Sequence, residues 1–124
     1  MINDYITMTY QQTLDYLYAS QPAFHLVGSA AYKPGLDNTY RLMQHLGNPH
    51  EKLHVVHVAG TNGKGSTCRY MYSILQEAGY KTGLYTSPFL EKFNERIEFN
   101  GDMISDEDLS VYTDRVLAEV KNMT

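Results

Sequence analysis

The sequence predicts an α/β fold organised around a phosphate-binding loop, and three neighbouring segments carry this prediction. The apolar, β-branched segment at residues 53–59 (LHVVHVA) has the composition of a strand buried on both faces. A glycine-rich run at residues 60–67 (GTNGKGST) follows it, and residues 65–78 then change to the period of an amphipathic helix. Together with a short strand at residues 81–86, these segments predict a strand–helix–strand unit of a parallel sheet with flanking helices.

Two helices and a loop are expected before this unit. Residues 9–20 place apolar side chains at helical spacing, with Thr9 as the N-cap and Pro22 as a stop signal. Residues 24–35 contain two glycines and a proline among small residues, which indicates a loop. The spacing predicts a second helix over residues 36–46, because an apolar stripe there is followed directly by Gly-Asn-Pro.

The segments after residue 86 predict a loop, a hairpin and a final helix. Residues 89–95 show no regular pattern and are expected to form the loop. The dipeptide Asn100-Gly101, flanked by residues 96–99 and 103–104, is favoured in tight hairpin turns. Ser105 is expected to cap the last helix, whose apolar face would consist of Leu109, Tyr112, Val116, Leu117 and Val120.

The composition indicates a globular chain and excludes several classes of function. The chain has 124 residues, of which 43% are apolar and 19% are charged, the length of one domain at most. Its net charge of -4 lacks the basic surplus that binding to nucleic acid requires. No apolar run approaches the roughly eighteen residues of a membrane span, and the first ten residues do not resemble a signal peptide. Cys68 is the single cysteine, which fits a reducing compartment, so we expect a cytoplasmic protein. From the charge and the lack of long apolar runs, we expect neither a nucleic-acid nor a membrane partner.

The glycine-rich run is the strongest functional signal because it lies between the expected strand and helix. Glycines let backbone N–H groups turn toward an anion, the helix N-terminus adds positive partial charge, and Lys64 supplies a cation for the β- and γ-phosphates. Val58 and Gly65 depart from the strict P-loop pattern, which has glycine and a hydroxyl residue at these places. A glycine-rich connection that merely turns the chain is the alternative. The nucleotide-binding candidates are Gly60, Thr61, Asn62, Gly63, Lys64, Gly65, Ser66 and Thr67.

Three stretches of the sequence resemble one enzyme family. They are residues 33–38 (KPGLDN), residues 57–67 (HVAGTNGKGST) and residues 79–97 (GYKTGLYTSPFLEKFNERI). These stretches resemble the bacterial folylpolyglutamate synthases and dihydrofolate synthases, a branch of the Mur ligase superfamily. Gly65 is typical of the folate branch, since related Mur ligases usually carry a hydroxyl residue directly after the loop lysine. The resemblance implies a P-loop NTPase-like fold similar to the central domain of the Mur ligases.

The resemblance also implies a reaction. Enzymes of this family use ATP to activate a folate carboxylate as an acyl phosphate, which the amino group of L-glutamate then attacks. A backbone cradle, a lysine and Mg²⁺ suffice for such phosphoryl transfer, because it needs chiefly positioning and charge neutralisation. ATP and Mg²⁺ are therefore the expected cofactors, and Lys64 is the expected catalytic residue. The sequence leaves open whether dihydropteroate, tetrahydrofolate or both are substrates.

By similarity, residues outside the glycine-rich run contribute to the site as well. Ser87, just past the second expected strand, would ligate Mg²⁺, although a plain turn before Pro88 is the alternative. The segment of residues 89–96 resembles the family's loop over the folate site. The candidate substrate-binding residues are Phe89 and Phe93 as pterin neighbours, Arg96 as an anion partner, and Tyr32, Lys33 and Pro34 beside the pteroate.

The number of expected strands indicates an incomplete domain. A doubly wound nucleotide-binding sheet has five or more strands, whereas this sequence predicts two core strands and a hairpin. We therefore interpret residues 1–124 as the N-terminal part of an ATP-binding domain: helices and a folate-side loop (1–50), the strand–helix–strand unit (53–86), and a loop, hairpin and helix (87–124). Alone it is expected to be monomeric and inactive. A Mur-type ligase for another acid and a non-catalytic nucleotide-binding module are the alternative functions.

Overall fold

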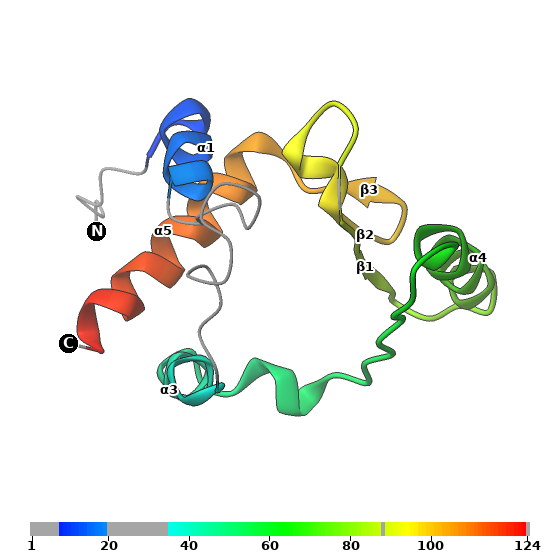
Figure 1. The fold of residues 1–124 in the computed structure, drawn as a ribbon, viewed down its shortest axis with the longest axis horizontal. Coiled ribbons are helices and arrows are strands. Elements are labelled where there is room, and N and C mark those ends of the chain that lie inside the picture. Colours follow the sequence, from blue (N-terminus) through cyan, green and yellow to red (C-terminus); the bar gives the residue numbers. More distant parts are fainter. Residues whose placement is uncertain (1–7, 20–34, 88, 124) are drawn as a thin grey trace. The chain divides into compact units, whose positions relative to one another are not determined.

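The described part of the chain forms two compact units. The computed structural model describes residues 8–19, 35–87 and 89–123 (Figure 1). One unit combines residues 1–53 with residues 110–124, and the other comprises residues 54–109. The glycine-rich run and the site candidates at residues 87–96 therefore belong to the second unit.

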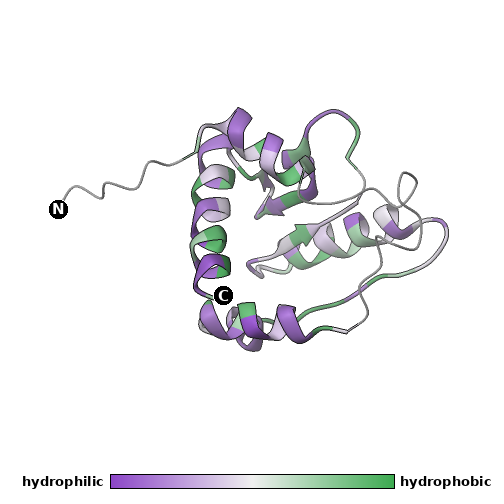
Figure 2. Ribbon diagram, turned by 60° about the vertical axis from the view of Figure 1, so that its left-hand side comes forward, coloured by the Kyte–Doolittle hydropathy of each residue, from purple (hydrophilic) through white to green (hydrophobic). Residues whose placement is uncertain are grey.

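The described residues of the first unit are mainly helical. The helix α1 (Tyr10–Ala19) lies beside α5 (Asp106–Asn122), and the hydroxyls of Thr13 and Ser110 share a hydrogen bond of 3.0 Å between them (Figure 1). Both hydroxyl residues are buried, so the bond satisfies two polar groups inside the helix contact. In Figure 2, hydrophobic and hydrophilic residues alternate along α5, as its amphipathic pattern predicts.

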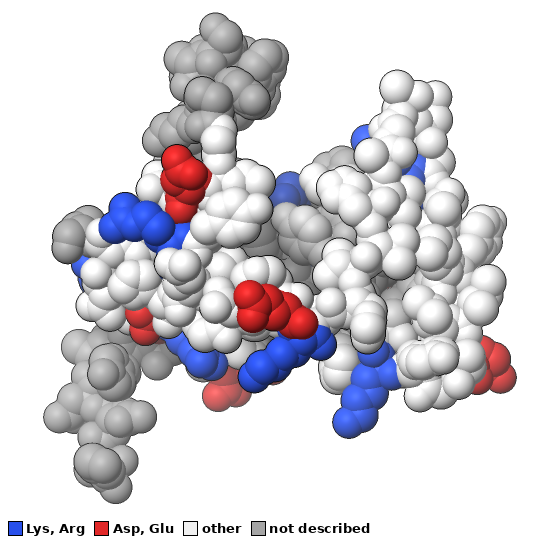
Figure 3. Space-filling model, turned by 90° about the horizontal axis from the view of Figure 1, so that it is seen from below, with Lys and Arg blue, Asp and Glu red and all other residues white. Residues whose placement is uncertain are grey.

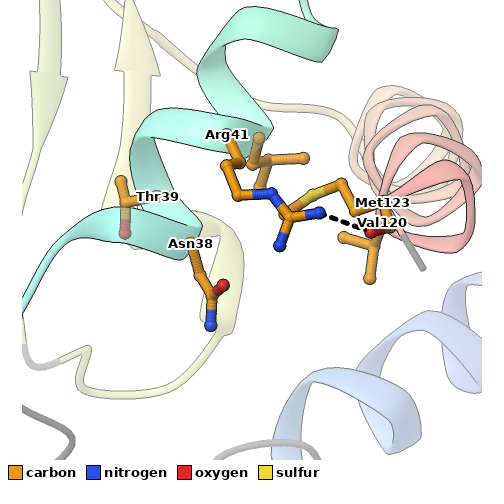
Figure 4. A pocket seen from close by; sticks show the side chains of 6 residues that line it. Asn38, Thr39, Arg41, Val120 and Met123 are labelled. Atoms are coloured by element: carbon orange, nitrogen blue, oxygen red, sulfur yellow. Dashed lines mark hydrogen bonds between the residues drawn. The ribbon is translucent and has the colours of Figure 1, made fainter.

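The helix α3 (Asp37–His45) contacts the C-terminal end of α5. The guanidinium of Arg41 donates to the carbonyl oxygen of Met123 at 2.6 Å, and these two residues line a shallow hollow together with Asn38, Thr39, Leu42 and Val120 (Figure 4). Past α3, the chain turns at Gly47 (φ 83°) and enters the short 3₁₀ helix η2 (Pro49–Lys52). The helices predicted from the sequence over residues 9–20 and 36–46 are thus confirmed.

In the second unit, α4 (Lys64–Glu77) packs against a small antiparallel sheet. The sheet has the order β1 (Gly83–Tyr85), β2 (Ile97–Phe99), β3 (Asp102–Met103). Tyr72 of α4 is only 4% exposed, and its hydroxyl accepts a hydrogen bond from the N–H of Gly101 at 2.5 Å. This bond ties α4 to the turn between β2 and β3.

The boundaries of α4 and the hairpin follow the sequence signals. Gly79 (φ 92°) ends α4, with its N–H donating to the carbonyl of Gln76 and the next N–H donating to that of Leu75. The turn residues Asn100 and Gly101 both have positive φ, 49° and 96°, as a two-residue hairpin turn requires. Ser105 accepts a hydrogen bond at its hydroxyl from the N–H of Asp108 at the start of α5. The predicted helix, hairpin and capping serine are confirmed.

The structure differs from the prediction at residues 53–59. This segment forms no strand, and the side chains of Leu53, Val55 and Val56 are 64%, 74% and 65% exposed instead of buried. In addition, β1 pairs with β2 in antiparallel orientation, so the predicted parallel strand–helix–strand unit is not formed. The physical reason is that a strand requires a ladder partner, and no described segment pairs with residues 53–59. The fold remains α/β, with its sheet on one side of α4.

Within the described residues, no helix has the length and apolar character needed to cross a membrane. On the face seen in Figure 3, the Lys and Arg side chains lie interspersed with Asp and Glu side chains. The charge of the sequence is thus spread over this face in both signs.

Candidate functional site

The glycine-rich run leads directly into the N-terminus of α4. Gly63 has a left-handed conformation (φ 76°, ψ 6°), which glycine adopts without steric penalty, and α4 starts at the next residue. The first hydrogen bond of this turn runs from the N–H of Thr67 to the carbonyl of Gly63 at 3.0 Å. The N–H groups of residues 64–66 therefore lack a carbonyl partner within the helix and face out beyond its end. Such free N–H groups, together with the helix dipole, favour binding of an anion.

The side chain of Lys64 lies next to the glycines of the run. Its Cγ is 3.8 Å from the place that a Cβ on Gly60 would occupy, which is an ordinary van der Waals distance. The stem of Lys64 is therefore directed back over the run and not along the far side of α4. Gly65 has ordinary helical backbone and open space at its Cβ position. The structure thus gives Gly63 a conformational reason to be glycine, but gives none for Gly65.

The rest of the run is open to solvent. All residues from Gly60 to Thr67 are exposed, including the hydroxyl residues Thr61, Ser66 and Thr67. The backbone and hydroxyl groups of the run are therefore accessible to a ligand from solvent. The nucleotide-binding candidates thus occupy a connecting loop and the first turn of α4.

Ser87 lies at the far end of β1 on an exposed stretch. The residue before it, Thr86, donates its N–H to the carbonyl of Arg96 at 2.9 Å, which fixes this stretch beside the start of β2. Among the described residues of the second unit, no hydrogen bond or ion pair connects Ser87 with the glycine-rich run. Its hydroxyl is accessible to a ligand but is not oriented by a described partner.

Three of the substrate-binding candidates form a tight cluster. The rings of Phe89 and Phe93 lie 5.9 Å apart between centroids at an angle of 59°. The guanidinium carbon of Arg96 lies 5.1 Å from the centroid of Phe89 and 5.2 Å from that of Phe93, within the range of a cation–π contact. The Nε of Arg96 is buried and makes no hydrogen bond. The cluster thus combines two flat apolar surfaces with a cation that retains an unused donor.

Two residues that sequence reasoning missed hold the cluster's backbone. Asn94 is 1% exposed, and its amide nitrogen donates to the carbonyl of Ile104 at 2.8 Å and to the carboxylate of Asp106 at 3.0 Å. Next to it, the carboxylate of Glu95 accepts three backbone N–H groups of the preceding loop. The partners of Asn94 lie ten and twelve residues away, and a single sequence contains no periodic signal for such contacts. The available signal for Glu95 was its position three residues after Lys92, the spacing at which a Glu side chain reaches back to the N–H of an N-cap residue.

The donors to Glu95 also change its ionisation. Hydrogen bonds from the N–H groups of Lys92, Glu91 and Leu90 stabilise the carboxylate and hold the pKa of Glu95 below its ordinary value of 4.5. Glu95 is therefore ionised at neutral pH. The remaining substrate-binding candidates, Tyr32, Lys33 and Pro34, lie outside the described residues.

The chain resembles known proteins in its sequence and in its structure. No protein-family profile matches the chain. The dihydrofolate synthase/folylpolyglutamate synthase of Bacillus subtilis is 49% identical over 89 residues, which are 72% of this chain and 21% of that protein. The chain is a relative of the folylpolyglutamate synthases and dihydrofolate synthases. It spans about a fifth of the length of this B. subtilis relative.

Solved structures of folylpolyglutamate synthases have the same fold in this region. The folylpolyglutamate synthetase from Lactobacillus casei superposes with a TM-score of 0.81 at 34% identity, over 94% of this chain and 27% of that chain. A folylpolyglutamate synthase solved as a complex with AMPPCP and folate superposes with a TM-score of 0.76 at 33% identity, over 94% of this chain and 27% of that chain. AMPPCP is an analogue of ATP, so that neighbour binds both a nucleotide and a folate.

Proposed function

We propose that this chain supplies the phosphate-binding loop and the folate-side loop of an ATP-dependent ligase that joins L-glutamate to a folate. The observation that carries the proposal is the run at residues 60–67, which opens α4 with free N–H groups and Lys64 beside it. The same chain is 49% identical to a dihydrofolate synthase/folylpolyglutamate synthase over 89 residues. The nucleotide and folate in a neighbouring solved complex support both halves of the proposal.

The chemistry assigned to the loop is positioning of the triphosphate. The N–H groups at the start of α4 and the ammonium of Lys64 would hold the β- and γ-phosphates, so that negative charge on the transferred phosphoryl group is neutralised. The folate carboxylate attacks the γ-phosphate and ADP leaves. The amino group of glutamate then attacks the acyl phosphate, and inorganic phosphate is released with the new amide. No nucleophile of the protein is needed in either step.

Ser87 is the residue that we assign to a magnesium ion. Its exposed hydroxyl is an oxygen donor of the kind that Mg²⁺ prefers, and Mg²⁺ commonly takes its remaining ligands from water and phosphate oxygens. When bound, the ion would add positive charge beside the phosphates. Ser87 is thus assigned as one ligand of a site that nucleotide and water would complete.

The folate side is assigned to the cluster of Phe89, Phe93 and Arg96. A pteridine ring is flat and aromatic, so it stacks favourably on phenylalanine rings, and the folate carboxylates are anions that a guanidinium binds. Tyr32, Lys33 and Pro34 are assigned to the pteroate by family resemblance.

A nucleotide-binding module without ligase activity is the second candidate. The observation that favours it is the glycine-rich run itself, whose N–H groups at the start of α4 can bind phosphate without any step of ligation. We therefore propose that the isolated 124 residues bind nucleotide and do not ligate. A Mur-type ligase acting on another acid has no such support, since both the curated and the solved relatives are named for folate.

The test is a chimera in which residues 9–120 replace the matching region of the B. subtilis ligase. In a chimera that unfolds cooperatively, we expect phosphate release from ATP that requires both L-glutamate and a reduced folate. The Lys64→Ala chimera should lose this activity, whereas Lys81→Ala, at an exposed lysine in the same unit, should retain it. Phosphate release that is indifferent to folate would refute the assignment, and ligation of a non-folate acid would favour the Mur-type alternative.

A further inference from the structure

We propose that Glu95 is a positioning residue, whose carboxylate holds the loop of residues 89–92 in the shape that presents Phe89, beside Phe93, to the ligand. For the identity of that ligand, a folate, the inference rests on the proposed function. Its structural part, that one carboxylate organises the loop, stands on contacts within the second unit. Glu95 does not touch the proposed substrate site itself; it acts through the backbone that carries the rings.

The carboxylate gathers three successive N–H groups. Oε1 accepts from Leu90 at 3.1 Å, and Oε2 accepts from Glu91 at 2.9 Å and from Lys92 at 2.6 Å. Hydrogen bonds to an ionised acceptor are about twice as strong as neutral ones, and consecutive N–H groups that converge on one anion form a recognised binding concavity. The loop therefore binds an anion that belongs to its own chain.

At Leu90 the loop has no apolar side-chain anchor, whereas its two ends are held by the ring contacts of Phe89 and by the ion pair of Lys92 with Asp106. Leu90 is 92% exposed, so its side chain gives the loop no apolar anchor. Apart from the carboxylate, the described bond that closes this turn runs from the N–H of Glu95 to the carbonyl of Lys92 at 3.0 Å. Without the carboxylate, the three consecutive N–H groups of residues 90–92 would have to donate to water instead, and they would no longer share one acceptor that fixes their relative positions.

The other end of the segment is anchored independently. Asn94 holds the segment to the connection before α5, and Lys92 pairs with Asp106 at 2.7 Å between Nζ and Oδ1. Loss of the Glu95 carboxylate should therefore release the loop locally and leave the hairpin and α5 in place. Phe89 would be affected more than Phe93, because it precedes the released turn in the sequence, whereas Phe93 adjoins the anchored residue Asn94.

The side chains of Glu95 and Arg96 thus act on the same loop in two ways. Glu95 fixes its backbone, and Arg96 lies over the rings of Phe89 and Phe93 at 5.1 and 5.2 Å. A loop that is shaped before the ligand arrives does not lose conformational freedom on binding, which raises affinity. The expected consequence is that a change at Glu95 weakens folate binding without a change in any residue that touches folate.

The decisive variant is Glu95→Gln, with Glu91→Gln as the matched control. Glutamine keeps the size of the side chain but removes the charge and replaces one acceptor oxygen with a donor, whereas the Glu91 side chain is exposed in the same loop. In the 124-residue protein at neutral pH, amide hydrogen exchange at Leu90, Glu91 and Lys92 should be about tenfold faster in Glu95→Gln. Exchange in Glu91→Gln should equal that of the wild type. Unchanged exchange in Glu95→Gln would overturn the inference.

Two further readings separate a local from a global effect. Amides of α4 and of the hairpin must remain protected from exchange in Glu95→Gln. If these amides lose their protection as well, the variant Glu95→Asp is tested instead of Glu95→Gln. The shorter side chain of aspartate keeps the negative charge but cannot reach all three N–H groups. With Glu95→Asp, we expect faster exchange at one or two of these amides. If a folded Glu95→Asp protein exchanged at wild-type rates at the amides of Leu90, Glu91 and Lys92, this would also contradict the inference.

Titration with folic acid links the loop to the ligand. In the wild type, the ring resonances of Phe89 and Phe93 should shift, and Glu95→Gln should bind about tenfold more weakly. If the loop is released in Glu95→Gln but folic acid binds equally well, the positioning role is refuted. If folic acid does not shift these rings in the wild type, the proposed function fails on the folate side, while amide exchange still decides whether Glu95 holds the loop.

Discussion

The two candidate binding regions of the second unit differ in what holds them in shape. In the folate-side segment, residues 89–106, the side chains of Glu95 and Asn94 bind backbone groups of the same segment. The phosphate-side segment, residues 53–67, runs exposed into α4 and takes its geometry from the start of that helix. The comparison teaches that side chains of its own sequence shape the first region, whereas the second takes its geometry from backbone hydrogen bonds at its two ends, at Leu53 and at the start of α4.

The apolar composition of the phosphate-side segment makes its exposure informative. Leu53, Val55 and Val56 are each more than 60% exposed, although burial of such a side chain is worth about 1.5–3 kcal/mol. Figure 1 shows the segment as a plain connection between η2 and α4. If another strand paired with residues 53–59, this segment would therefore gain both apolar contacts and the hydrogen bonds of a β-ladder.

The largest effect on stability is expected at Asn94. In Asn94→Ala, the carbonyl of Ile104 and the carboxylate of Asp106 lose a buried donor, so the free energy of unfolding should fall by about 1–3 kcal/mol. Urea unfolding followed by circular dichroism measures this. Asn122→Ala, at an exposed asparagine, is the control and should stay within about 0.5 kcal/mol of the wild type. Equal stability of Asn94→Ala and wild type would remove the claim that the folate-side region is held from within.

Two glycines of the phosphate-side region should respond in opposite directions. Gly63→Ala places a Cβ at φ 76° and should destabilise the protein by about 1–2 kcal/mol. Gly65→Ala meets no atom within 4 Å in the first turn of α4 and should stabilise it by up to about 1 kcal/mol. Thermal unfolding of both variants compares them directly. A destabilised Gly65→Ala protein would mean that the start of α4 has a constraint that its backbone does not reveal.

The folate-side loop should respond to pH, and the sign follows from Glu95. Because its pKa is lowered on folding, the carboxylate contributes stability above its ordinary value of 4.5, and this contribution is lost as the pH falls through the lower folded value. The other charged side chains of the segment are those of Glu91, Lys92, Arg96 and Asp106. Amide exchange at Leu90, corrected for its intrinsic pH dependence, should be protected at pH 6 and lose protection below about pH 4.5. Protection that persists undiminished at pH 2 would show that the carboxylate is not what holds the loop.

The smallest effect is expected at Val56. Since its side chain is 65% exposed, Val56→Ala should change the free energy of unfolding by less than about 0.5 kcal/mol. A loss of about 1 kcal/mol or more in the 124-residue protein, measured by urea unfolding, would mean that this segment is covered in solution. If a neighbouring strand covers residues 53–59 in the chimera, the same substitution should cost more there than in the 124-residue protein.

Local signals were sufficient for most of the fold. Capping residues, apolar stripes and the Asn100-Gly101 turn predicted the helices and the hairpin, because each of these depends on residues close in sequence. The pairing of β1 could not be predicted, since the same residues 81–86 fit a parallel or an antiparallel neighbour. The predicted strand at residues 53–59 failed for a related reason: its composition describes a buried environment that no described segment provides.

The candidate site was predictable only where its residues are close together in the sequence or match a known family. The glycine-rich run was found because its eight residues are contiguous, and Phe89, Phe93 and Arg96 were identified from resemblance and do lie together. Asn94 and Glu95 were not found, because their roles depend on backbone groups whose positions the sequence does not specify. The roles of Ser87 and of the cluster toward ligands remain predictions.

The central claim is that residues 60–67 bind the phosphates of ATP through Lys64, and calorimetric titration tests it most directly. Mg²⁺–ATP would be titrated into the 124-residue protein and into the variants Lys64→Ala and Lys81→Ala. We predict that the wild type and Lys81→Ala bind with equal affinity and that Lys64→Ala binds about 10–100-fold more weakly, as loss of a charged phosphate contact implies. Equal affinity of Lys64→Ala and the wild type, or no binding by the wild type, would contradict the claim.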